Sequence, residues 1–252
     1  MTDILWTELD DGVLRLTLNR PDKRNALNLA LIDALHQAIE RADLDAQVRV
    51  VTIEGAGKDF CAGADLDELL ASASQPPEAN ARDAMRLGDL FLAMRRLPKP
   101  VVAIVQGRAL AGGSGLATAC DLVLAHANAQ FAYPEVQRGF VPAMVMALLR
   151  RTVGEKRAFD LVTTGRVVSA DEAASLGLIS RVSSADGFAA DVATIVRGLA
   201  SASPTALALT KQQFYALDGM PVAEGIRLGA DVNALARSTP DFAAIIASFL
   251  KR

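Results

Sequence analysis

The centre of the sequence runs Ala103-Ile-Val-Gln-Gly107-Arg-Ala-Leu-Ala-Gly112-Gly113-Ser-Gly115-Leu-Ala-Thr-Ala-Cys-Asp121, and this stretch decides the fold. The apolar, β-branched run from Val101 to Val105 predicts a buried strand, and Leu116 to Cys120 predicts the start of a helix. The glycines between them leave room for a ligand to approach main-chain N–H groups. The helix points its positive end at the same place, so the stretch predicts a site for an anion or an oxyanion.

This glycine pattern differs from the motifs that bind nucleotides or carry a nucleophilic serine. The third glycine of a dinucleotide fingerprint is missing, and no Gly-Lys-Ser/Thr is present, which excludes a P-loop. Leu116 stands where a Gly-x-Ser-x-Gly elbow needs its last glycine. A tight strand-to-helix turn without function is the alternative for this stretch taken alone.

The composition favours a globular protein that binds small molecules. The 252 residues are 51% hydrophobic, enough for one large domain or a domain with an appendage. The net charge of -3 and the pI near 5.5 argue against a general nucleic-acid or anionic-membrane binder. Neither the two cysteines nor any cluster of histidines and acids has metal-ligand spacing, so we expect no metal. No signal peptide and no membrane-length apolar run is recognisable, which predicts a cytoplasmic location.

The hydrophobic pattern predicts strands and helices in alternation, followed by helices alone. Strands are expected at 12–18, 49–53 and 121–125, and a helix is expected after its capping residue Asn28. A further helix should end at Pro98, whereas 71–84 predicts a mobile connection and 130–135 a loop. From about Asp186 onward only helices are expected, two of them beginning at Ser203-Pro204 and Thr239-Pro240.

Two small-residue loops, Cys61 to Asp65 and Ala111 to Gly115, each follow a strand and could each offer one backbone N–H. Two donors that converge on one oxygen stabilise an enolate, by about 3 kcal/mol per donor. Glu135 follows in an apolar and aromatic segment, where loss of hydration raises a carboxyl pKa into the range suited to moving a proton beside a carbonyl. The alternative is that Glu135 is an ordinary surface acid.

Several segments, in this order and spacing, resemble the crotonase (enoyl-CoA hydratase/isomerase) family over essentially the full length of the chain. They are 19–27, 60–65, 99–107, 111–115, 120–121, 131–135, 154–158, 164–165 and 173–178. The resemblance implies an α/β fold in which repeated ββα units form a spiral at 1–195. It also implies a helical C-terminal region at 196–252 that assembles a homotrimer or a dimer of trimers.

The resemblance also implies the site. The N–H groups of Ala64 and Gly112 would form the oxyanion hole, and Glu135 would be the acid/base residue. The CoA part of an acyl-CoA substrate would lie along Lys23, Arg24, Ala26 and Leu27, with the Ala62 backbone near the adenine. Lys251 and Arg252 are further candidates, for the CoA of a neighbouring subunit. Coenzyme A enters as part of the substrate, so no separate cofactor is expected.

One position departs from the family pattern. Hydratases of the family use two glutamates, and the first of them would fall at Gly115. Hydration of a 2-enoyl-CoA and a 3-enoyl to 2-enoyl double-bond shift therefore both stay open, the latter needing Glu135 alone. A non-catalytic acyl-CoA or RNA-binding member of the same fold is the alternative. Cys61 and Tyr133 are expected to pack, and Phe140, Met144 and Met146 are assigned to a helix core rather than to the acyl pocket.

Overall fold

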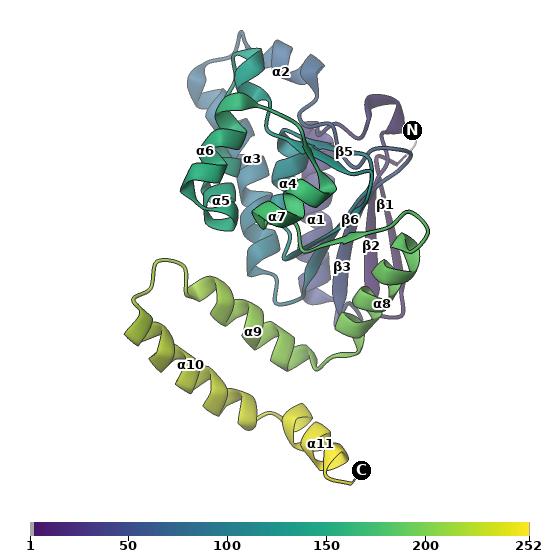
Figure 1. Cartoon of the computed structure of the whole chain (residues 1–252), viewed down its shortest axis with the longest axis vertical. Helices are drawn as coiled ribbons and strands as arrows, with labels where there is room; N and C mark the ends of the chain where they lie inside the picture. The colour runs from purple at the N-terminus through teal and green to yellow at the C-terminus, as the bar shows by residue number, and fades with distance from the viewer. Residues whose placement is uncertain (1–2, 252) are drawn as a thin grey trace.

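A computed structural model describes residues 3–251 of the chain (Figure 1). The helices are α1 Leu29–Leu44, α2 Leu66–Ser72, α3 Pro77–Arg96, α4 Gly112–Ala119, α5 Ala143–Val153, α6 Glu155–Thr164, α7 Ala170–Leu176, α8 Phe188–Ser201, α9 Pro204–Ala216, α10 Val222–Arg237 and α11 Pro240–Phe249, with 3-10 turns η1 Pro21–Lys23 and η2 Glu135–Arg138. The strands are β1 Leu5–Asp10, β2 Val13–Leu18, β3 Val50–Gly55, β4 Val101–Val105, β5 Arg108–Leu110, β6 Leu122–His126, β7 Gln130–Ala132, β8 Val168–Ser169 and β9 Arg181–Ser183.

A six-stranded sheet in the order β1-β2-β3-β4-β6-β9 forms the centre of the molecule. All neighbours run parallel except β1 and β2, which form an antiparallel hairpin. Successive side chains of a strand point to opposite faces, so Val51 and Ile53 join the large core cluster that includes α1 and α3, while Val50 packs with α8. Helices cover both faces, as a buried parallel sheet requires. The predicted α/β class and the four predicted strands are confirmed.

A second sheet of three short strands, β5-β7-β8, lies next to α4. It overturns two expectations. Residues 130–132 form β7, which pairs with both β5 and β8, instead of a loop. Helix α4 begins at Gly112, earlier than expected. Its first turn consists of small residues, which are typical of a loop in sequence, but here they are needed because other segments approach the helix closely.

The expected mobile connection at 71–84 is also wrong. Helix α2 ends at Ser72, and α3 begins at Pro77, with Pro77 in its first turn and Glu78 close to the positive end of the helix. The small and charged residues that suggested a connection lie on the exposed first turns of α3. Their polarity reflects exposure and not a lack of structure.

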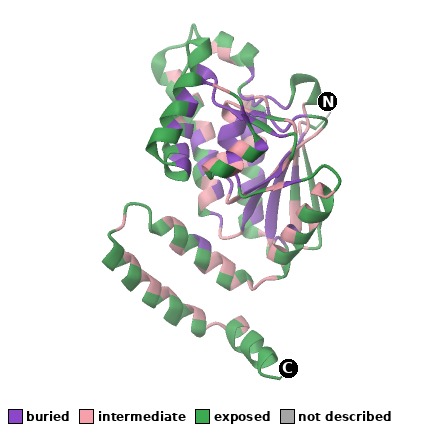
Figure 2. Cartoon of the chain, viewed as in Figure 1, coloured by how far each residue is buried: buried purple, intermediate pink, exposed green. Residues whose placement is uncertain are grey.

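The C-terminal helices extend away from the core (Figures 1 and 2). After Ser183 the described chain is helical, and α9 and α11 begin at the two predicted proline positions, which confirms that part of the pattern. Neither α10 nor α11 buries a residue within the described chain, and large apolar side chains of both helices are exposed. The predicted boundary between 195 and 196 falls inside α8, and the division of the chain there stays a prediction.

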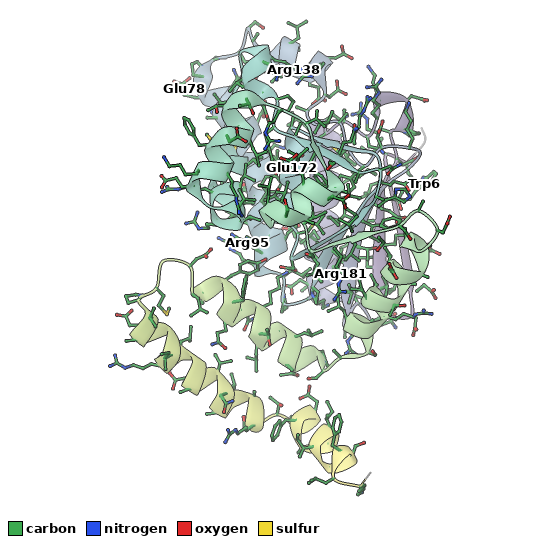
Figure 3. The ribbon with its side chains drawn as sticks, in the orientation of Figure 1. Trp6, Glu78, Arg95, Arg138, Glu172 and Arg181 are labelled. Atoms are coloured by element: carbon green, nitrogen blue, oxygen red, sulfur yellow. The ribbon has the colours of Figure 1, made fainter. Side chains whose placement is uncertain are left out.

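One buried polar cluster joins α9 to the core. Lys211 donates from Nζ to the carbonyl oxygens of Met94 and Lys99, and to Asp121 at 2.6 Å. Tyr215 donates its hydroxyl to the same carboxylate, also at 2.6 Å. Arg95, labelled in Figure 3, places its guanidinium 4.1 Å from the centre of the Tyr215 ring.

No single helix of residues 3–251 is both long and apolar enough to cross a membrane. Helices α8 and α9 meet that composition only when taken together, and they are bent by 101° at their junction.

Candidate active site

The two small-residue loops meet because glycine allows their backbones to touch. Ala64 pairs with Leu27 and Cys61 with Ala109 in single parallel bridges, which hold the first loop between its neighbours. A Cβ at Gly63 would lie 2.8 Å from the Cβ of Ala111, and a Cβ at Gly113 would lie 2.2 Å from the Cys61 carbonyl oxygen. Any larger residue at either position would push the loops apart.

Ala64 and Gly112 line the same cavity. The neighbouring amides are occupied, since Asp65 donates to Leu27 and Ala111 donates to Ala132. Within residues 3–251, the Ala64 and Gly112 N–H groups donate to no protein acceptor. A Cβ at Gly112 would lie 3.8 Å from the Ala64 nitrogen, so the two donors are close enough to share one oxygen.

Ala111 turns the backbone so that Gly112 presents its N–H. Its φ of +50° with ψ of −124° lies in a region that a residue with a Cβ rarely occupies. Such strain costs on the order of 1–3 kcal/mol and clusters at functional sites. Gly112 and Gly113 begin α4, whose positive end adds to the field at the two donors.

Glu135 lies across the same space, as the first residue of η2. The residue is only 7% exposed, and its Oε2 is buried without a hydrogen-bond partner among the described residues. Burial raises the pKa of the Glu135 carboxyl, while its own backbone N–H and the charge of Arg138 oppose that shift. A buried carboxylate with a free oxygen and a raised pKa is suited to accept a proton from carbon.

A cavity of about 470 Å³ contains most of the predicted site. Its lining includes Lys23, Arg24, Ala26, Ala62, Ala64, Gly112 and Glu135. Leu27 is absent from the lining and lies behind Gly112, because its Cδ1 would be 3.6 Å from a Cβ there. The other walls are largely apolar and include Phe140 and Met144. Met144 lies on α5 and also packs against the core, as predicted, whereas the assignment of Phe140 and Met146 to the helix core is wrong, because Phe140 precedes α5 and both side chains are exposed.

A larger cavity of about 580 Å³ lies on the other face of the central sheet, between its strands and α8. None of the predicted site residues lines it. Size alone would favour this second cavity, but only the cavity at Gly112 contains, among the described residues, the two N–H groups without acceptors together with the buried acid Glu135.

Residues that the sequence did not single out hold the loop 19–27, which carries most of the predicted CoA contacts. Arg20 binds Asp65 at 2.7 Å, and this contact lowers the Asp65 pKa. Asn25 is fully buried and donates to the carbonyl oxygens of Ala56 and Asp59. Lys23 binds Asp67 at 2.8 Å on the surface. Arg20 and Asn25 both belong to the segment 19–27, so the motif signalled them although their partners could not be read from it.

The side of the cavity beside Gly115 is apolar and full. A Cβ at Gly115 would lie 2.4 Å from Cγ2 of Val145 and 3.4 Å from the ring of Phe91. Val145 itself lines the cavity. The position therefore holds neither a carboxylate nor space for one.

Cys61 and Tyr133 pack, as expected from the sequence. Cys61 is fully buried, and burial raises the pKa of its thiol to about 12, which removes it as a nucleophile. Tyr133 is fully buried, and its hydroxyl is 2.8 Å from the Thr118 hydroxyl. Within residues 3–251, no group of three or more His, Cys, Asp or Glu side chains could hold a metal ion.

Comparisons with known proteins extend over nearly the whole chain. The model of the enoyl-CoA hydratase/isomerase family matches residues 8–250. A Thermus thermophilus protein provisionally named an enoyl-CoA hydratase is 42% identical over 93% of this chain and 93% of its own length. The 2,3-dehydroadipyl-CoA hydratase of Escherichia coli is 34% identical over 95% of this chain and 92% of its own length.

A solved structure extends the likeness to the whole fold. The enoyl-CoA hydratase of Mycobacterium smegmatis superposes with a TM-score of 0.94 at 34% identity, over 98% of this chain and 96% of that one. The predicted resemblance and the predicted fold are confirmed. This chain belongs to the enoyl-CoA hydratase/isomerase family.

Proposed function

We propose that the cavity binds an acyl-CoA thioester and that Glu135 moves a proton at the carbon beside the thioester carbonyl. The observation that carries this proposal is the buried, unpartnered Oε2 of Glu135 in the same cavity as two backbone N–H groups without acceptors. The N–H groups of Ala64 and Gly112 hold the thioester oxygen as it gains enolate charge. Each donor contributes about 3 kcal/mol at that stage.

The reaction that fits this site best is a double-bond shift. Glu135 takes a proton from C2 of a 3-enoyl thioester, the electrons move through a dienolate, and the same carboxyl returns the proton at C4. One acid/base group is sufficient. The other carboxylates of the lining are already occupied, Asp65 by Arg20 and Asp67 by Lys23.

Hydration of a 2-enoyl thioester is the second candidate. It is favoured by the hydratase names of the Thermus and Escherichia relatives. It requires Glu135 to serve both the attacking water and the proton delivered to C2, because Val145 and Phe91 fill the space beside Gly115.

Two further elements belong to the proposal. Lys23, Arg24, Ala26, Leu27 and Ala62 bind the CoA part, with the two cations near its phosphates. The exposed apolar faces of α10 and α11 support assembly into a trimer or a dimer of trimers. Lys251, exposed after α11, is the proposed contact to a neighbouring CoA, whereas Arg252 lies outside the described residues. The absence of a separate cofactor and a cytoplasmic location stay predictions.

Proton NMR in heavy water tests the reaction. Short 2-enoyl-CoA and 3-enoyl-CoA thioesters are incubated separately with the protein. Conversion of the 3-enoyl substrate without a hydroxyacyl product supports the double-bond shift, and a 3-hydroxyacyl product from the 2-enoyl substrate supports hydration. Binding of both thioesters with neither turnover nor deuterium exchange at C2 or C4 would refute the catalytic role and favour a binding protein.

A further inference from the structure

Arg138 shares the cavity with Glu135. Both residues belong to η2, a 3-10 turn that runs from Glu135 to Arg138 and ends at Gly139 in the left-handed region. Side chains three residues apart in a 3-10 turn lie on the same side, about 6 Å apart along the axis. Both residues line the cavity, and the positive charge of Arg138 is felt at the Glu135 carboxyl.

Arg138 is exposed, and within residues 3–251 its guanidinium makes neither an ion pair nor a hydrogen bond, so its charge acts on Glu135 only through space. Arg20 and Lys23, on the CoA side, are bound to Asp65 and Asp67. Arg24, also on that side, makes no ion pair with any described residue, and the proposed function assigns it to a CoA phosphate.

The surroundings of Arg138 differ from those of the CoA-side cations. Phe140, Val141 and Met144 follow it in the chain and line the same cavity, so the part of the lining contributed by the segment after Glu135 is apolar apart from one guanidinium. Figure 3 shows Arg138 at the end of the molecule farthest from the C-terminal helices. An acyl chain held at Glu135 would extend along this apolar wall and meet a single positive charge.

We propose that Arg138 binds the distal carboxylate of the acyl group, so that the preferred substrates are short dicarboxylyl thioesters instead of plain fatty acyl thioesters. This inference rests on the proposed function for the position of the acyl chain. A guanidinium binds a carboxylate through two parallel hydrogen bonds, a geometry that a neutral methyl end cannot supply. The rise of about 6 Å between the two residues suits a chain of a few carbons between the reacting atoms and the carboxylate.

A matched pair of substrates tests the proposal. Hex-3-enoyl and hex-3-enedioyl groups differ at one end, and each is prepared as the CoA thioester and as the pantetheine thioester, which lacks the nucleotide phosphates. The wild-type protein should favour the dicarboxylyl group by about 10- to 100-fold in kcat/KM on both carriers. Arg138→Met should abolish this preference on both carriers.

Arg24→Met is the matched control. It should lower kcat/KM for the CoA thioesters relative to the pantetheine thioesters. It should leave the preference for the dicarboxylyl group over the hexenoyl group unchanged. An Arg138→Met effect confined to the CoA thioesters would overturn the proposal, because it would mark a phosphate contact. An equal loss on both acyl groups would also overturn it, because it would mark a role in orienting Glu135.

Measuring the affinity for unreactive thioesters makes the test independent of turnover. Saturated hexanoyl-CoA and adipyl-CoA cannot react, and their dissociation constants are measured by calorimetry. Tighter binding of adipyl-CoA by about tenfold or more, lost in Arg138→Met, supports the carboxylate site even if the enoyl thioesters are not turned over. Equal affinity for the two saturated thioesters in the wild-type protein would refute the site while leaving the proposed chemistry standing.

Discussion

Asp121 and Glu135 are two carboxylates held largely within the α/β core, and their surroundings differ. Asp121 accepts hydrogen bonds from Lys211, from Tyr215 and from the Val101 N–H. Glu135 leaves one oxygen buried without a partner among the described residues, near two N–H groups that also lack acceptors and beside the strained backbone of Ala111.

The difference is the one expected between a structural carboxylate and the reactive carboxylate that we propose. A buried polar group that is fully satisfied stabilises one arrangement of the chain. A buried group that is left unsatisfied costs free energy of folding, and proteins retain such groups where chemistry needs them. Changes at Glu135 should therefore alter the rate, and changes around Asp121 should alter the stability.

Glu135→Gln gives the largest expected effect. Loss of the acid/base group should lower kcat by about 10²- to 10⁴-fold, while the unfolding free energy stays the same or rises, since the amide carries no charge to desolvate. Steady-state kinetics and denaturant unfolding measure the two quantities. Glu78→Gln, on the exposed first turn of α3, is the control: it should leave kcat unchanged and lower the unfolding free energy by no more than about 1 kcal/mol, through the loss of its charge near the helix N-terminus. Undiminished turnover in Glu135→Gln would remove Glu135 from the mechanism.

Lys211→Met tests the other half of the comparison. Lys211 is 8% exposed and makes three hydrogen bonds, so its loss should lower the unfolding free energy by about 3 to 5 kcal/mol and leave kcat of the folded fraction unchanged. Chemical denaturation measures the unfolding free energy, and steady-state kinetics measures kcat. Arg150→Met breaks an exposed pair with Glu155 and should be indistinguishable from wild type. A Lys211→Met protein with wild-type stability would mean that the cluster is not structural.

Gly115→Glu probes the apolar side of the cavity. The new side chain collides with Val145, so we expect a loss of about 2 kcal/mol in unfolding free energy. The double variant Gly115→Glu with Val145→Ala should recover part of that loss, because the methyl groups in the way are gone. If the single variant is as stable as wild type, Val145 does not fill this space rigidly.

The acid limb of the pH profile gives the smallest expected effect. Glu135 must be ionised to accept a proton, and its pKa is raised by burial, so kcat/KM should fall with decreasing pH at a midpoint above the ordinary glutamate value of about 4.3. Arg138→Met removes a charge that lowers this pKa and should move the midpoint higher. An unchanged midpoint in Arg138→Met would mean that the charge of Arg138 does not influence the pKa of Glu135.

The sequence predicted the elements that local patterns specify. Short apolar runs located β3, β4 and β6, and prolines located the starts of α9 and α11. The segments around Ala64, Gly112 and Glu135 were each short and weak, but their order along the chain predicted that they meet. The structure brings all three to one cavity.

What the sequence did not reveal depends on contacts between distant residues. Strands of two or three residues, such as β7 and β8, carry too few residues for a periodic signal, so their pairing was missed. From the sequence, Gly115 looked like the loss of an acid. In the structure the position must be glycine because Val145, thirty positions later, fills the space that a side chain would need. Lys211 looked like one more helix lysine, because Asp121, Met94 and Lys99 are far away in the chain.

The Lys211 cluster also sets an order for folding during synthesis. Its partners lie 90 to 117 residues earlier in the chain, so strands β4 and β6 leave the ribosome long before the lysine that neutralises Asp121. Until α9 is made, Asp121 is held by the Val101 N–H without its cation. Docking of α9 is therefore a late step, and α10 and α11, which follow it in the chain, take their place relative to the core only after it is complete.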